Sequence, residues 1–133
     1  MGKAKIIVCD DSEVVLEFAR GALEEAGYTV VTTDNPLSLA HVIRRELPDL
    51  ILIDVNMPSI SGDAVTLIFG NTGVAKNVPI LLHSDLTAAE LETRAKRAGA
   101  TGFIQKTGDE AQLVEGVARF LASRARGASP SVP

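Results

Sequence analysis

The sequence is poor in cysteine, and it has no long apolar run. Cys9 is the single cysteine among 133 residues, so no disulfide can form within the chain, which is typical of cytoplasmic proteins. No stretch approaches the roughly 20 apolar residues of a membrane-spanning helix, and no signal peptide is evident before the first apolar run. We therefore expect a cytoplasmic protein that has no membrane partner.

Positive charge and aromatic residues are also scarce. Thirteen lysines and arginines stand against 17 acidic residues, and the net charge is -4. Non-specific binding to nucleic acids or anionic membranes requires a basic surface, so neither partner is expected. Aromatic residues make up 4% of the chain against 46% hydrophobic residues, which indicates an aliphatic core. Cys9 lies in an apolar run and is predicted to be an inert core thiol.

What the sequence does contain is a regular alternation of short apolar runs with amphipathic segments. This alternation predicts a single α/β domain over residues 1–124, followed by a disordered tail over residues 125–133. Strands are predicted at residues 5–9, 28–33, 50–54, 78–83 and 102–105. Helices are predicted from Ser12 to Ala26, from Pro36 to Leu47, through 64–69 with fraying at 70–73, from Asp85 or Thr87 to Ala98, and from 109 to 124.

The run Leu50–Asp54 is the centre of this pattern. Four consecutive aliphatic residues predict a strand that is buried on both faces, as strands of parallel sheets are. The run ends on the carboxylate of Asp54, and Pro58 prevents a helix from starting at once. Asp54 alone could simply cap a turn. The carboxyl end of a central parallel strand is, however, where open α/β sheets bind ligands.

Other polar residues follow the neighbouring strands. Asp10 and Asp11 follow the first, Ser84 the fourth and Lys106 the fifth, and each alone could be a cap or a surface charge. In a parallel sheet these strand ends lie at one edge, beside Asp54. Carboxylates about 4 Å apart repel by about 4 kcal/mol at an effective dielectric constant near 20, so three of them together require a cation. Oxygen ligands with open positions suit Mg²⁺.

Together with Met57–Pro58, Gly62 and Phe103, these residues resemble the receiver domain of two-component response regulators. The resemblance covers essentially the whole fold-forming chain. It implies a doubly wound (βα)5, flavodoxin-like sandwich with a five-stranded parallel sheet in the order 2-1-3-4-5.

The resemblance also implies roles for the site residues. Asp54 would accept a phosphoryl group from a sensor histidine kinase or a phosphotransfer protein. Lys106 would neutralise charge on the phosphoryl oxygens. Mg²⁺ would be held by Asp54 and three further groups: the side chains of Asp10 and Asp11 and the backbone carbonyl of Asn56.

The resemblance also implies that phosphorylation changes the shape of a protein-binding surface. The Ser84 hydroxyl would bind the phosphoryl group and draw its loop inward, and Phe103 would turn into the vacated space. A downstream protein would then bind at the face made by the fourth helix, fifth strand and fifth helix. On this reading the chain is not an enzyme, although it assists its own Mg²⁺-dependent phosphotransfer and dephosphorylation, and the domain itself binds no nucleic acid.

Two positions depart from the family pattern. The residue after Ser84 is usually small but here is Asp85, which puts the efficiency of phosphorylation in question. The residue after Lys106 is usually a proline but here is Thr107, which puts the placement of the lysine in question. Both histidines, His41 and His83, are predicted to be structural, with His83 pointing away from the pocket because it alternates with Ser84.

These departures leave alternatives open. The chain could be a degenerate receiver that acts by binding alone, or a receiver cut from a longer regulator with an output domain. A phosphohydrolase that uses Asp54 as nucleophile is less consistent with the sequence, because such enzymes carry an acid/base aspartate where this chain has Asn56. A flavodoxin-like cofactor binder would need a glycine-rich loop after the first strand, where Asp10 and Asp11 would instead repel a phosphate.

Overall fold

A computed structural model describes residues 4–125, in which helices cover both faces of one parallel sheet. The sheet order is β2-β1-β3-β4-β5, and every strand pair is parallel, so the predicted fold class and strand order are confirmed. The strands are β1 (Lys5–Cys9), β2 (Thr29–Thr33), β3 (Leu50–Asp54), β4 (Ile80–Ser84) and β5 (Gly102–Gln105).

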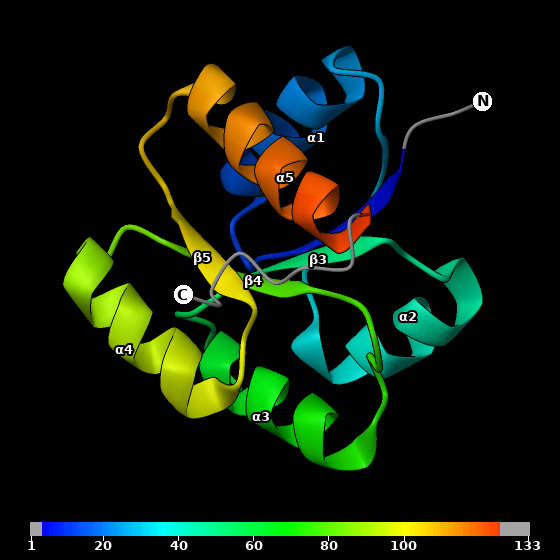
Figure 1. The fold of residues 1–133 in the computed structure, drawn as a ribbon, viewed down its shortest axis with the longest axis vertical. Coiled ribbons are helices and arrows are strands. Elements are labelled where there is room, and N and C mark those ends of the chain that lie inside the picture. Colours follow the sequence, from blue (N-terminus) through cyan, green and yellow to red (C-terminus); the bar gives the residue numbers. More distant parts are fainter. Residues whose placement is uncertain (1–3, 126–133) are drawn as a thin grey trace.

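The helices form one layer on each side of the sheet (Figure 1). Helices α1 and α5 lie on one side, and α2, α3 and α4 lie on the other. Right-handed crossover connections produce this arrangement when the strand order reverses next to the first strand. The helices are α1 (Glu13–Glu25), α2 (Leu39–Glu46), α3 (Gly62–Thr72), α4 (Ala88–Ala98) and α5 (Glu110–Ala125).

The core is aliphatic and is divided in two by the sheet. Side chains of β3 alternate between the two halves: Leu50 and Leu52 pack under α1 and α5, whereas Ile51 and Ile53 pack over α2, α3 and α4. All five residues of β3 are buried, as expected for the central strand of a covered parallel sheet. Because the backbone of β3 is held by neighbours on both sides, the residue at its end has a fixed position.

Side-chain caps start the helices that surround the carboxyl edge of the sheet. Ser12, Ser61 and Thr87 each accept a hydrogen bond from a backbone N–H in the first turn of α1, α3 and α4, respectively. The cap of α4 is therefore Thr87, one of the two predicted residues, and not Asp85. Gly99 ends α4 in the left-handed conformation with φ +75°.

Some predicted boundaries were wrong. Strand β4 begins at Ile80 rather than at 78 and includes Ser84, because Pro79 has no N–H to donate to a strand ladder. A 3-10 helix, η1 (Pro36–Ser38), precedes α2, which begins three residues later than predicted. Helix α3 does not fray at residue 70; it continues to Thr72 and ends at Gly73, which adopts a left-handed φ of +75°.

The predicted tail lies largely outside the part of the chain that the structure describes. Residue 125, its first residue, is the last residue of α5, and residues 126–133 are not described. Among the described helices none is long and apolar enough to cross a membrane.

Candidate functional site

The carboxyl edge of the sheet brings together the residues that the sequence predicts at strand ends. Asp10 and Asp11 follow β1, Asp54 ends β3, Ser84 ends β4, and Lys106 follows β5. The centre of the group is an ion triad formed by Asp10, Lys106 and Asp54. The Lys106 Nζ lies 2.8 Å from the Asp10 Oδ2 and 3.0 Å from the Asp54 Oδ1.

The two carboxylates of this triad are held by backbone groups as well. The Asp10 Oδ1 accepts a hydrogen bond of 2.9 Å from the Ser12 N–H, at the start of α1. The Asp54 Oδ1 accepts one of 3.3 Å from the Asn56 N–H, in addition to that from Lys106. These donors orient the Asp54 carboxylate and leave its Oδ2 available for chemistry.

Burial sets the electrostatics of the triad. Asp10 and Asp54 are only 1% and 4% exposed, whereas the Lys106 side chain is 22% exposed. Burial raises the pKa of Asp54; Lys106 lowers it, Asp10 raises it further, and the net shift is upward. Partial burial lowers the pKa of Lys106, but its two carboxylate partners outweigh this effect and raise the pKa above the usual value. Lys106 therefore stays charged at neutral pH.

One lysine does not balance the carboxylates at this edge. Oxygen atoms of Asp10, Asp11 and Asp54 all lie within 4.8 Å of one another, and Asp11 is exposed to solvent. At that separation each ionised pair repels by roughly 3.5 kcal/mol at an effective dielectric constant near 20. Two buried carboxylates and one exposed carboxylate form an oxygen-only ligand set that is open to water, which fits Mg²⁺.

Gly62 allows α3 to begin directly against the end of β3. A Cβ atom at this position would come within 2.1 Å of the Asp54 carbonyl oxygen, so only glycine fits. The Gly62 N–H donates to the Val55 carbonyl, which closes the loop between β3 and α3. Asn56 lies exposed in this loop, two residues beyond Asp54, and its carbonyl as a metal ligand stays a prediction.

Ser84 is buried at the end of β4, directly before the loop that leads to α4. Its Oγ accepts a hydrogen bond of 3.1 Å from the Leu86 N–H, and its hydroxyl hydrogen can still donate. Its neighbour Asp85 is exposed. Because Asp85 can turn into solvent and does not cap α4, its repulsion of a phosphoryl group is screened by water.

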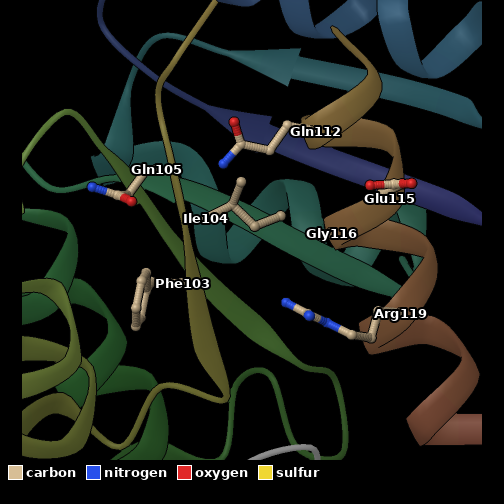
Figure 2. Close-up of a pocket in the computed structure, with 7 residues that line it drawn as sticks. All are labelled: Phe103, Ile104, Gln105, Gln112, Glu115, Gly116 and Arg119. Atoms are coloured by element: carbon tan, nitrogen blue, oxygen red, sulfur yellow. The ribbon is translucent and has the colours of Figure 1, made fainter. Parts of the chain in front are cut away.

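Phe103 and Ile104 extend to opposite sides of β5 (Figure 2). Phe103 is partly buried and packs against the core under α3 and α4. Ile104 extends toward α5 and lines one cavity together with Gln112, Glu115 and Arg119 of that helix. The volume of this cavity is about 550 Å³, and its lining includes both Phe103 and Arg119.

His83 is buried near the carboxyl end of β4, one residue before Ser84. It pairs with Asp54 across the sheet and lines, with Lys106, a cavity of about 230 Å³ between α1 and the loop after β5. Burial and the charge of Lys106 lower the pKa of His83 to about 3, so it is neutral. That His83 points away from the phosphorylation pocket stays a prediction; the cavity that it lines does not include Asp10, Asp54 or Ser84 among its lining residues. His41 lies exposed within α2.

Thr107 holds the loop after β5 without a cis peptide bond, of which there is none between residues 4 and 125. Its hydroxyl accepts from the Asp109 N–H and donates to the Gln112 side chain. The Asp109 carboxylate accepts from the Ala111 and Gln112 N–H groups at the start of α5. Side-chain caps therefore order this loop, and the ion pairs of Lys106 fix its ammonium group.

Cys9 is buried in the core next to this edge, as predicted. Burial, followed by the nearby carboxylates of Asp10 and Asp54, raises the pKa of its thiol to about 12. At neutral pH the group is a thiol rather than a thiolate, so it is inert.

Comparison with known proteins shows which family the chain belongs to. Residues 6–118 match the family model of the response regulator receiver domain. The chain belongs to the response regulator receiver family. It is thus a signalling domain of a two-component system.

Individual relatives of this receiver are distant in sequence but similar over nearly the whole chain. The polar-differentiation response regulator DivK of Brucella anthropi is 25% identical over 116 residues, which are 87% of this chain and 94% of DivK. The chemotaxis response regulator CheY4 of Vibrio cholerae is 28% identical with a TM-score of 0.79, covering 87% of this chain and 97% of CheY4.

A response regulator of the LuxR family from Aurantimonas is similar to this receiver to the same degree. It is 28% identical with a TM-score of 0.79, and the match covers 96% of this chain and 91% of that protein. The receiver fold is therefore shared across the described part of the chain.

Proposed function

We propose that this receiver is switched by phosphorylation of Asp54. The phosphoryl donor is a phosphohistidine on a sensor histidine kinase or on a phosphotransfer protein. The observation that carries the proposal is the buried triad in which Lys106 contacts Asp10 and Asp54 at the end of the central strand. The site lies in the cytoplasm, where ATP is available to charge the kinase, and it needs neither a membrane nor a nucleic acid.

The chemistry is a transfer between two nucleophiles. The Asp54 Oδ2 attacks the phosphorus, an acyl phosphate bond forms, and the phosphorus–nitrogen bond breaks, with its electron pair staying on the donor imidazole. Lys106 lies where it can contact a phosphoryl oxygen while it still faces Asp10. Positioning and charge neutralisation account for most catalysis in phosphoryl transfer, and the chain supplies both without a separate enzyme.

Mg²⁺ would be held by the carboxylates of Asp10, Asp11 and Asp54 and by the Asn56 carbonyl. When bound, the ion supplies positive charge to the phosphoryl oxygens. The same residues would assist hydrolysis of the acyl phosphate by water. This self-catalysis is part of the proposal.

Incubation with Mg²⁺ and a small phosphodonor such as acetyl phosphate, followed by intact-mass measurement, tests the function directly. One added phosphoryl group is expected, and it should map to Asp54. A chain that gains no phosphoryl group under these conditions would instead act by binding alone. Asp85 and Thr107, the two departures from the receiver pattern, are the features that favour that second candidate.

Asp11→Ala should weaken Mg²⁺ binding at least about tenfold, because Asp11 is the exposed member of the carboxylate cluster and has no ion pair with Lys106. A ligand at 100 times its Kd stabilises the folded state by about 2.7 kcal/mol, so the loss is measurable as a smaller Mg²⁺-induced rise of the urea midpoint. Asp34→Ala, an exposed carboxylate that follows β2, is the matched control and should keep the full rise. Equal responses in both variants would remove Asp11 from the metal site.

The phosphorylated state is proposed to act through Ser84 and Phe103. Donation from the Ser84 hydroxyl to a phosphoryl oxygen would draw the loop between β4 and α4 inward. Phe103 and Leu86, a residue of this loop, are both partly buried and pack against the same core. Its further burial would reshape the groove between β5 and α5 (Figure 2), where a downstream protein would bind.

The phosphodonor is proposed to dock on α1, at the rim of the site. Val14 is 79% exposed, and it lines the same cavity as Lys106, so a protein that delivers a phosphohistidine to Asp54 covers it. Val14→Asp should slow transfer from a histidine kinase by about tenfold, the effect of losing one central apolar contact, and leave labelling by acetyl phosphate unchanged.

The control for this prediction is Leu67→Asp on α3, where an exposed leucine lies on the other side of the sheet. It should affect neither reaction. Equal transfer rates from the kinase to wild type and to the Val14 variant would place the donor on another face.

A further inference from the structure

The loop between β4 and α4 is attached to β5 by a side chain. The Gln105 Nε2 donates a hydrogen bond of 3.0 Å to the Leu86 carbonyl. The N–H of the same Leu86 donates to the Ser84 Oγ at 3.1 Å. Leu86 is therefore held at both of its backbone polar groups, by Ser84 at the end of β4 and by Gln105 at the end of β5.

The position of Gln105 is fixed by its pairing in the sheet and does not depend on the loop between β4 and α4. It is the last residue of β5, it pairs with Ser84 in the parallel register, and the Lys106 N–H donates to the Ser84 carbonyl at 2.7 Å. In Figure 2 its side chain extends to the same side of β5 as Phe103 and away from α5. The strand end is fixed, so the Gln105 amide is a stationary donor toward a loop that has to move.

We propose that Gln105 is a positioning residue that holds the β4–α4 loop outward in the unphosphorylated receiver and thereby opposes the movement of Ser84. This inference rests on the proposed phosphorylation of Asp54. A Ser84 hydroxyl that turns to a phosphoryl group pulls the Leu86 peptide with it. The Leu86 carbonyl then moves away from the Gln105 amide, which stays with β5, and the hydrogen bond is lost.

The contact therefore favours one state over the other, which is the condition for a residue to bias a conformational equilibrium. The main-chain bond from Lys106 to Ser84 belongs to the sheet pairing at the strand ends, so it gives no such bias. A net hydrogen bond of ordinary strength corresponds to a factor of roughly two to ten in the equilibrium between the two loop positions. Its removal should raise the affinity for a phosphoryl group or its mimic by that factor.

Gln105→Met removes the amide donor and keeps the length of the side chain. Gln112→Met is the matched control, because Gln112 lines the same groove but bonds to Thr107 instead of Leu86. The first measurement is amide hydrogen exchange at residues 85–88 without metal or phosphodonor. We expect roughly two- to tenfold faster exchange in the Gln105 variant and wild-type exchange in the control.

The second measurement is the affinity for beryllofluoride with Mg²⁺, a mimic of the phosphoryl group. The Gln105 variant should bind it roughly two- to tenfold more tightly, even if its urea midpoint falls. If the contact were merely structural, its loss would lower both the affinity for beryllofluoride and the urea midpoint. Unchanged exchange at residues 85–88, or unchanged or weaker beryllofluoride binding beside a wild type that binds, overturns the inference. A wild type that does not bind beryllofluoride counts against the proposed function, and the exchange data then decide the role of Gln105 separately.

Discussion

Asp54→Asn abolishes phosphate incorporation from acetyl phosphate and from a histidine kinase, while the fold is kept. The amide has nearly the shape of the carboxylate, but its oxygen carries no formal charge and is a poor nucleophile. Lys106 keeps its contact of 2.8 Å with Asp10, so no buried charge is left without a partner. Intact-mass measurement after incubation with Mg²⁺ and acetyl phosphate should show a labelled fraction at background level.

The stability of this variant provides an independent check. Burial raises the pKa of Asp54, so the folded state binds its proton more tightly than the unfolded chain does. The stabilising contribution is thus fully present below the unfolded pKa and is lost as the pH rises through the folded pKa. Asp54→Asn should remove this pH dependence and should not lower the urea midpoint at neutral pH. Labelling at the wild-type level would move the acceptor to another residue.

Lys106→Met slows phosphorylation by about 10²- to 10³-fold, the effect of removing one preorganised charge from a transition state. It also destabilises the metal-free protein, because Asp10 and Asp54 then face each other in a buried site without a cation. Breaking a buried ion pair costs about 3–5 kcal/mol, and the lower end applies because the Lys106 side chain is 22% exposed. Urea unfolding and phosphodonor labelling measure the two effects.

The response of the Lys106→Met variant to Mg²⁺ separates the role of Lys106 in phosphorylation from its role in stability. It should bind the Lys106→Met variant more tightly than wild type, because the competing ammonium group is gone, and it should restore much of the lost stability. It should not restore the rate, because Mg²⁺ would be held by the carboxylates and would not replace the Lys106 ammonium group that contacts the phosphoryl oxygens. Lys96→Met is the control: Lys96 forms an exposed ion pair with Glu92 on α4, and its loss should change the free energy of unfolding by no more than about 0.5 kcal/mol. A Lys106 variant as stable as this control would exclude a buried triad.

Most of the fold could be predicted from local patterns. The apolar runs at 5–9, 50–54 and 102–105 have the predicted bounds, because β-branched and aliphatic runs form strands wherever a sheet covers them. Boundaries at proline and glycine were less accurate. Pro36 starts a 3-10 turn before α2, and α3 continues through Gly70 to Gly73, because packing against the core decides how far a helix continues.

The membership of the site could also be predicted, because strand polarity places every carboxyl end of a parallel sheet at one edge. The sequence alone therefore determined the fold class, the strand order through its family resemblance, and the positions of the aspartates, Ser84 and Lys106 at that edge. The fold class and these positions follow from the periodicity of apolar residues and from the direction of the chain, both of which can be determined from the sequence.

Only the tertiary structure decided the contacts among them. Lys106 reaches Asp54 across 52 residues and Asp10 at the same time, Gln105 bonds to Leu86, and His83 lines one cavity together with Lys106. Such contacts depend on strand register, sheet twist and the packing of helices on both faces, which together fix side-chain positions to within a hydrogen bond. Local sequence patterns carry no information at that precision, because the partners are distant in the chain and meet only when the whole sheet has formed.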